Sequence, residues 1–227
     1  DVLLTSAVTA SQRLSPVSYI GANTFFFHQG EQISLTTLQK RLAAAGYANV
    51  KQVLAAGEFA VRGSIVDVFP MGSERPFRLD FFDDEIESIR WFDVDTQRSM
   101  ESAEEIRLLP GHEFPVDPEA LLAFRQRWRR EFAGDPKKSI VYCDIEKEIL
   151  PPGIEYYLPL FFDETAALTD YLPPNARVFL LGDIEAALQA FGRDMASRYK
   201  VLAADPQRPA LAPERIWLKP EEFFKSL

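Results

Sequence analysis

The chain has 227 residues, of which 47% are hydrophobic and 26% charged, a balance typical of a folded protein with one large domain or two small ones. A single cysteine, Cys143, excludes an internal disulfide and hence a disulfide-stapled secreted fold, and it favours a reducing compartment. The net charge of −9 opposes nonspecific binding along DNA, which needs a basic face that releases counterions. No run of about 18 apolar residues is present, so we expect no membrane-spanning helix.

The first segments along the chain predict strand, strand and helix. Residues 1–6 are apolar at three successive positions, which predicts a short buried strand. No turn or cap precedes this strand, so we expect the chain to be part of a longer protein. Residues 23–33 contain three successive phenylalanines and are predicted to be extended. A helix is predicted next, with Ser34 as its N-cap and Gly46 just beyond its C-terminus.

Strand signals dominate residues 57–110. The segment FAVRGSIVDVF, residues 59–69, predicts an extended stretch with a bulge at Gly63. PFRLDFF, residues 76–82, alternates in polarity, and EIESIRWFDV, residues 85–94, completes another strand. We therefore expect a small antiparallel sheet with one helix packed against it.

Phe82 is the residue in this sheet whose environment matters most. Alternation directs Phe77, Leu79 and Phe81 toward the core and leaves Phe82 on the outer face with Arg78. An exposed aromatic ring beside arginines is typical of a protein-interaction hot spot. Alternatively, a second layer would cover this face or a bulge would turn Phe82 inward, and alternation alone does not decide between an exposed and a buried ring.

Composition changes after Pro110. One helix is predicted to start at the N-cap Asp117 and another near Asp183. Between them ARVFLLGD, residues 176–183, predicts a buried strand, and a strand followed by a helix indicates an α/β layer. The predicted fold class is therefore mixed: an α+β sheet domain beside an α/β subdomain.

Most catalytic chemistries find no support in the sequence. The chain contains no Gly-Lys dipeptide and so lacks a phosphate-binding loop for ATP hydrolysis. His28 and His112 lie far apart and away from cysteine, so neither a zinc site nor a nucleophilic Cys143 is expected. LDFFDDE, residues 79–85, resembles a magnesium-binding strand end, but a tight turn with a solvated acidic edge is the favoured interpretation. No cofactor is expected.

Four arginines crowd the helix predicted after Asp117. They are Arg125, Arg127, Arg129 and Arg130. They could form a docking surface for another domain or for nucleic acid. A solvated helix face paired with Glu119 and Glu131 is the favoured interpretation.

Long collinear segments of the sequence resemble a known family. GEFAVRGSIVDVFP, residues 57–70, and RLDFFDDEIESIRWFDVDTQRS, residues 78–99, resemble the domain shared by the excision-repair protein UvrB and the bacterial transcription-repair coupling factors. GIEYYLPLFF, residues 153–162, and DPQRPALAPERIWL, residues 205–218, resemble the coupling factors in particular. The resemblance implies that residues 1–22 end a subdomain 1A, residues 23–110 form domain 2, and residues 111–227 form a helicase-like subdomain 1B without ATP motifs.

The resemblance also implies a function and a site. Domain 2 of this family binds UvrA, and the family's contact residues correspond to Arg62, Arg78 and Phe82. The longer protein would be a cytoplasmic ATP-dependent DNA translocase that contacts RNA polymerase, DNA and ATP through other domains. A C-terminal domain of the same protein would mask the UvrA-binding surface. The segment itself would be noncatalytic, have no contact with a membrane, and recruit UvrA.

Two alternatives stay open from the sequence. The chain could be a fragment of UvrB, although it shows neither the aromatic lesion-probing hairpin nor the helicase motifs that the resemblance to UvrB would imply. It could also be a metal-dependent hydrolase that uses carboxylates of the 79–85 segment. The candidate ligands are Asp80, Asp83, Asp84 and Glu85.

Overall fold

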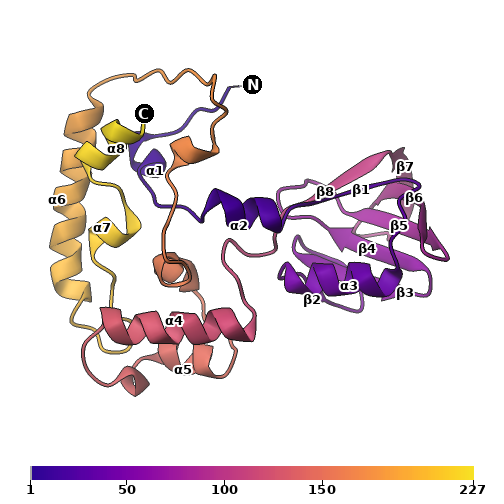
Figure 1. Ribbon diagram of the computed structural model, residues 1–227, viewed down its shortest axis with the longest axis horizontal. Coiled ribbons are helices and arrows are strands. Elements are labelled where there is room, and N and C mark those ends of the chain that lie inside the picture. The colour runs from indigo at the N-terminus through magenta and orange to yellow at the C-terminus, as the bar shows by residue number, and fades with distance from the viewer. Residues whose placement is uncertain (1) are drawn as a thin grey trace. The chain divides into compact units, whose positions relative to one another are not determined.

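The computed structural model describes residues 2–227, which form two compact units. The sheet unit comprises Ser18–Val116, and the helical unit comprises the residues up to Val17 together with Asp117–Leu227. Figure 1 shows strands gathered in the first and helices in the second. The mixed α and β fold class predicted from the sequence is confirmed. The assignment of residues 1–22, 23–110 and 111–227 to family subdomains stays a prediction.

A six-stranded sheet forms the framework of the sheet unit. Its strands follow the order β2-β3-β4-β5-β6-β7, and every neighbouring pair is antiparallel except β2 and β3. The strands are β2 (Ala48–Asn49), β3 (Glu58–Arg62), β4 (Ile65–Phe69), β5 (Phe77–Phe82), β6 (Glu85–Phe92) and β7 (Ser99–Ala103). The remaining elements are α2 (Val17–Ala22), α3 (Leu35–Ala44), and a two-stranded sheet of β1 (Phe25–His28) and β8 (Glu105–Leu108).

The helix α3 covers one face of the six-stranded sheet and closes the core (Figure 1). Ser34 caps α3 by accepting a hydrogen bond from the Thr37 amide, and Gly46 follows the helix at φ +87°, so both predicted helix ends are confirmed. Leu38 and Leu42 of α3 pack into the cluster that the inward side chains of the strands form. Those strand side chains include Phe59, Val66, Phe77, Leu79, Phe81 and Ile89. The predicted inner face of β5 is therefore confirmed.

Gly63 does not form the predicted bulge. It lies in the turn between β3 and β4 at φ +63°, a backbone conformation that favours glycine, so residues 59–69 are two strands rather than one. The bulge of this region lies between β5 and β6, where the register shifts between Asp80 and Phe81. The prediction was wrong because a glycine that breaks an apolar run marks either a bulge or a hairpin turn.

The helical unit is built mainly from two groups of helices. Asp117 caps α4 as predicted, and α4 lies beside α5, while α6 contacts α1, α7 and α8 (Figure 1). The helices are α1 (Ala7–Ala10), α4 (Pro118–Glu131), α5 (Ile140–Glu146), α6 (Ile184–Leu202), α7 (Pro213–Ile216) and α8 (Pro220–Ser226). The short 3-10 helices are η1 (Pro136–Lys138), η2 (Ile154–Leu160) and η3 (Leu168–Tyr171). No helix in residues 2–227 has both the length and the apolar character needed to cross a membrane.

Both strands predicted for this second unit are wrong. Residues 2–6 and 177–182 are irregular and exposed, and Asp1 lies outside the described residues. Residues 177–182 make no backbone hydrogen bond to any described residue. A strand needs a neighbour to satisfy its backbone groups, and no strand of the helical unit within residues 2–227 supplies one. The α/β layer that depended on residues 176–183 is therefore absent from the described helical unit, although the predicted start of a helix near Asp183 is confirmed, with Asp183 as the N-cap of α6.

The exposure of residues 177–182 predicts unusual tolerance to polar substitution. Phe179 and Leu181 are each 80% exposed, so Phe179→Ser and Leu181→Ser should each change the free energy of unfolding by less than about 0.5 kcal/mol. Leu188→Ala in α6 is the control, because Leu188 is buried and its truncation should cost about 3 kcal/mol. Urea denaturation measures the free energy of unfolding of the three variants. A loss above about 2 kcal/mol for Phe179→Ser would indicate that residues 176–183 form a buried strand after all.

Candidate functional site

The register of β3, β4 and β5 brings the predicted site residues to one face of the sheet, opposite α3. Asp67 of β4 pairs directly with Arg78 of β5, and Arg62 of β3 pairs with Ile65, two residues before Asp67. Because side chains alternate along a strand, Arg62, Asp67, Arg78 and Phe82 all point to this outer face. The predicted site residues Arg62, Arg78 and Phe82 therefore share this face with the Asp67 carboxylate.

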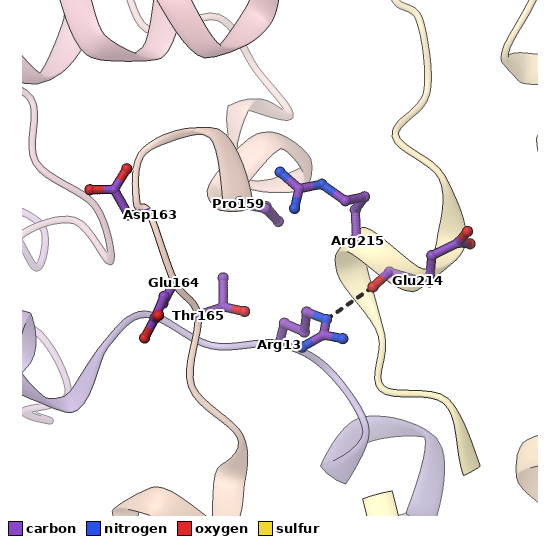
Figure 2. Close-up of a pocket in the computed structure, with 7 residues that line it drawn as sticks. All are labelled: Arg13, Pro159, Asp163, Glu164, Thr165, Glu214 and Arg215. Atoms are coloured by element: carbon purple, nitrogen blue, oxygen red, sulfur yellow. Dashed lines mark hydrogen bonds between the residues drawn. The ribbon is translucent and has the colours of Figure 1, made fainter. Parts of the chain in front are cut away.

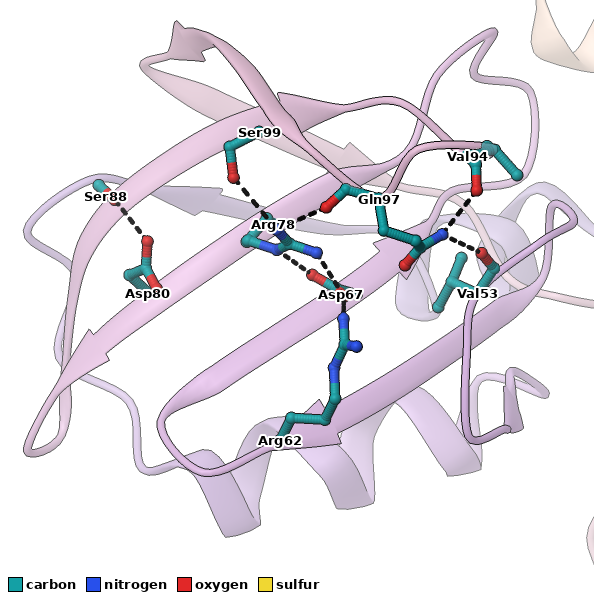
Figure 3. A network of polar contacts seen from close by, with 9 residues as sticks. All are labelled: Val53, Arg62, Asp67, Arg78, Asp80, Ser88, Val94, Gln97 and Ser99. Carbon is teal, nitrogen blue, oxygen red and sulfur yellow. Dashed lines mark hydrogen bonds and ion pairs between the residues drawn. The ribbon is translucent and has the colours of Figure 1, made fainter.

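Asp67 is the centre of a polar network on this face (Figure 3). Its side chain is fully buried, yet it carries a carboxylate. Arg78 binds it with two parallel hydrogen bonds, from Nε to Oδ1 at 2.6 Å and from Nη2 to Oδ2 at 2.9 Å. Arg62 donates a third from Nη2 to Oδ2. A buried carboxylate is tolerated only when it is paired and hydrogen-bonded, and both arginines meet that requirement here.

Arg78 is enclosed rather than projecting into solvent. Its side chain is 13% exposed, and its Nη1 donates to the Gln97 carbonyl and to the Ser99 hydroxyl, both at 3.2 Å. Its guanidinium carbon lies 4.9 Å from the centre of the Phe92 ring. The hydrogen bonds to Asp67 raise the pKa of Arg78, so the guanidinium stays charged. Arg78 thus lies on the outer face as alternation predicted, but its hydrogen bonds to Asp67 hold the guanidinium against the sheet and largely out of solvent.

Arg62 and Phe82 are the accessible members of the predicted site. The Arg62 side chain is 49% exposed, and Phe82 is 69% exposed. Phe82 closes β5 opposite Glu85, and the two-residue turn that follows holds Asp83 at φ +52°. The bulge one residue earlier leaves Phe81 buried and Phe82 outward, so it does not turn Phe82 into the core. Phe82 lies four residues along β5 from Arg78, roughly 13 Å away at strand spacing.

Asp67 and Gln97 were missed by sequence reasoning. Gln97 adopts φ +59°, and its side-chain amide donates to the Val53 and Val94 carbonyls, which ties two loops together next to Arg78. Beneath these loops, Val53, Ala60 and Phe92 form a small second core. The available signal was the single carboxylate in the apolar strand IVDVF, since an acidic residue there needs a basic partner on a neighbouring strand.

The carboxylates proposed as metal ligands are not arranged as a metal site. Asp80 accepts a hydrogen bond from Ser88 at 3.2 Å, and Glu85 accepts one from Gln32 at 2.7 Å. Among residues 2–227 no group of three or more acidic, histidine or cysteine side chains is placed to hold a metal ion. Cys143 donates from Sγ to the Lys137 carbonyl at 3.3 Å. The geometry of the described residues gives the hydrolase alternative no support.

Three of the arginines of α4, Arg125, Arg127 and Arg129, make contacts within the helical unit. Arg127 binds Asp163 at 2.6 Å, Arg125 lies 3.9 Å from Glu146, and the Arg129 guanidinium lies 5.5 Å from the centre of the Tyr142 ring. Arg125 and Arg127 do meet carboxylates, but their side chains are largely enclosed, so they do not form the solvated face that was the favoured interpretation. The predicted partners were wrong, because these contacts run to other elements rather than to Glu119 and Glu131. Glu131 instead pairs with Arg215 of α7 at 3.4 Å.

A cleft of about 350 Å³ opens in the helical unit between η2, α7 and the chain near Arg13 (Figure 2). Arg13 donates from Nε to the Glu214 carbonyl at 3.0 Å and pairs with Glu222 at 2.9 Å. The other charged groups that line it include Arg215 and Asp163, which are held in the ion pairs described above. Arg13, Arg215 and Asp163 are thus engaged in contacts within the helical unit.

Known proteins match this chain in two ways. Residues 25–114 match the model of a family described as the UvrB interaction domain. The chain is 43% identical over 227 residues to the transcription-repair-coupling factor of Escherichia coli (strain K12), and 44% identical over 229 residues to that of Haemophilus influenzae. The corresponding protein of Bacillus subtilis is 32% identical over 195 residues, or 78% of this chain and 16% of that protein.

The match at residues 25–114 covers most of the sheet unit, which is therefore similar to the UvrB interaction domain family. The two relatives above 40% identity are each matched over 100% of this chain and 20% of their own length, so the chain spans about a fifth of these proteins. The chain is thus homologous along its whole length to a segment of the bacterial transcription-repair-coupling factors, and the resemblance predicted from the sequence is confirmed.

Proposed function

We propose that this chain is a noncatalytic module of a transcription-repair-coupling factor that recruits UvrA. The observation that carries the proposal is Phe82, a ring 69% exposed at the end of β5 in the segment that matches the UvrB interaction domain family, on the same face as the half-exposed Arg62. The coupling factors matched along the whole chain support the same role, since their name joins transcription to repair.

The binding mechanism follows from the chemistry of this face. Phe82 would bury its ring in an apolar pocket of UvrA, and the removal of water around the ring would strengthen the ion pairs beside it. Arg62 would donate planar hydrogen bonds to a carboxylate of UvrA. Because the charged part of the contact is screened by ions, binding should weaken as the salt concentration rises.

Phe82→Ala is the direct test. The variant should bind UvrA about thirtyfold more weakly, a loss of about 2 kcal/mol, because the ring contributes most of the apolar contact. Titration calorimetry of UvrA with the chain measures the affinity. The free energy of unfolding should stay close to that of the wild type, since an exposed side chain contributes little to the core.

Phe26→Ala is the matched control. Phe26 is also an exposed phenylalanine on a strand, but it lies on β1 in the separate two-stranded sheet, with Arg107 near its ring. Its loss should leave UvrA binding within about twofold, which is the range of a surface change outside an interface. Equal losses for both variants, or no binding by the wild type, would contradict the proposed function.

The wider role belongs to the longer protein. We propose that it acts in the bacterial cytoplasm as an ATP-dependent DNA translocase that removes RNA polymerase stalled at a lesion, using domains outside this chain. Recruitment of UvrA by the sheet unit would then bring excision repair to that lesion. A C-terminal domain of the longer protein would mask the UvrA-binding face until the translocase engages.

A further inference from the structure

The polar network leaves the two arginines with very different capacities to bind a partner. An arginine has five N–H donors. Arg78 uses Nε and Nη2 on Asp67, and its Nη1 on Gln97 and Ser99. Among residues 2–227, Arg62 makes one side-chain hydrogen bond, from Nη2 to Asp67. Most N–H donors of Arg62 are therefore not used by the described residues of the network.

The network offers one carboxylate, that of Asp67, to two guanidinium groups, while Asp80 adds a second negative charge that acts on Arg78. Two guanidinium groups share the single carboxylate of Asp67, so the three side chains carry a net charge of +1. Asp67 is fully buried and Arg78 is 13% exposed, whereas Arg62 is 49% exposed. Arg62 is therefore the guanidinium group of this network that solvent and a partner can reach.

We propose that Asp67 is a positioning residue that fixes Arg62 as the guanidinium donor to the partner, and that Arg78 acts through Asp67 without touching the partner. This inference rests on the proposed recruitment of UvrA by the same face. It specifies the partner's surface as one carboxylate beside an apolar pocket, matched to Arg62 and Phe82.

The position of Arg62 explains why a tether matters. Arg62 is the last residue of β3 and is followed by the Gly63 turn, where few neighbours restrict a long side chain. A flexible arginine loses conformational entropy when it is immobilised in an interface. The bond from Nη2 to Asp67 restricts the side chain before the partner arrives, so less entropy is lost on binding.

A double-mutant cycle on UvrA binding tests this coupling. Arg62→Ala should weaken binding about thirtyfold and Asp67→Asn about tenfold, because the neutral amide loses the charge that attracts Arg62 and replaces one acceptor oxygen with an N–H donor group. The double variant should bind about as weakly as Arg62→Ala alone, since Asp67 acts only through Arg62. Losses that multiply, or unchanged affinity of a folded Asp67→Asn chain, would overturn the proposal. A merely structural role of Asp67 would lower the melting temperature and leave this non-additivity absent.

If Asp67→Asn does not fold, two lysine variants test which arginine contacts the partner. Arg62→Lys should weaken binding about tenfold, because a single ammonium cannot hold Asp67 and a partner carboxylate in the planar geometry of arginine. Arg78→Lys keeps a charge for Asp67 and should change the affinity of the folded chain by no more than about threefold. A larger loss for Arg78→Lys than for Arg62→Lys would assign the partner contact to Arg78.

A measurement on the free chain separates this inference from the proposed function. NMR relaxation of arginine side-chain nitrogens should find Arg62 more ordered than Arg75, an exposed arginine whose nearest carboxylate, on Glu101, is 3.8 Å away. Equal mobility of Arg62 and Arg75 would overturn the tether whether or not UvrA binds. Absence of UvrA binding together with an ordered Arg62 would contradict the recruitment role alone.

Discussion

Arg78→Ala is expected to lower the free energy of unfolding of the sheet unit by about 3 kcal/mol, because it removes a principal partner of a buried carboxylate. Asp67 would keep only the hydrogen bond from Arg62. The variant also loses the contact between the guanidinium and the Phe92 ring and the bonds to Gln97 and Ser99. Urea denaturation of the purified chain, followed by circular dichroism, measures the loss.

Arg75→Ala is the matched control for that substitution. Arg75 also belongs to the sheet unit, but its side chain is 57% exposed and lies 3.8 Å from Glu101. Exposed ion pairs contribute little, so this change should stay within about 0.5 kcal/mol. If Arg78→Ala were as mild as Arg75→Ala, Asp67 would not depend on Arg78, and the network would be only a surface ion pair.

Because Arg78→Ala is expected to destabilise the sheet unit, a loss of UvrA binding by this variant can arise from unfolding rather than from a lost contact. A variant that is partly unfolded loses affinity for any partner, since only the folded fraction binds. Weak UvrA binding by Arg78→Ala would thus not identify Arg78 as a contact residue. Binding has to be compared with Phe82→Ala at a temperature and denaturant concentration where both chains are folded.

The features that could be predicted from the sequence are local ones. The alternation of residues 76–82 suffices to separate Phe81 from Phe82, because side chains on a strand have a strict period of two. Helix ends at Ser34, Gly46 and Asp117 follow from capping chemistry that needs no tertiary information. The outward position of Phe82, which alternation alone left undecided, is a result of the structure.

The missed features depend on partners that are distant in the sequence. Asp67 meets Arg78 only because β4 and β5 pair in one register across an irregular connection, and that register is not readable from either strand alone. The same reason explains the error at residues 176–183. Four successive apolar residues favour a buried strand, but a strand forms only where another strand pairs with it, and the described helical unit offers none.

Trp128→Ala is expected to destabilise the helical unit by about 4 kcal/mol, the cost of emptying a large aromatic site in a core. Trp128 is buried, and its ring centre lies 4.5 Å from that of Phe132, 5.0 Å from that of Tyr157 and 5.8 Å from that of Phe124. Tyr156→Ala is the control, because Tyr156 is an exposed neighbour of Tyr157 and its loss should stay within about 0.5 kcal/mol.

Trp128→Ala also tests whether the UvrA-binding surface lies in the sheet unit alone. Phe82, Arg62 and Asp67 all belong to the sheet unit, which has its own core, so weakening the helical unit should leave UvrA affinity within about threefold of the wild type. Hydrogen exchange should show faster exchange in α4 and α5 while the amides of β4 and β5 stay protected. If Trp128→Ala abolished UvrA binding while β4 and β5 remained protected, residues of the helical unit would have to belong to the binding surface. The recruitment function would then require both units rather than the outer face of one sheet.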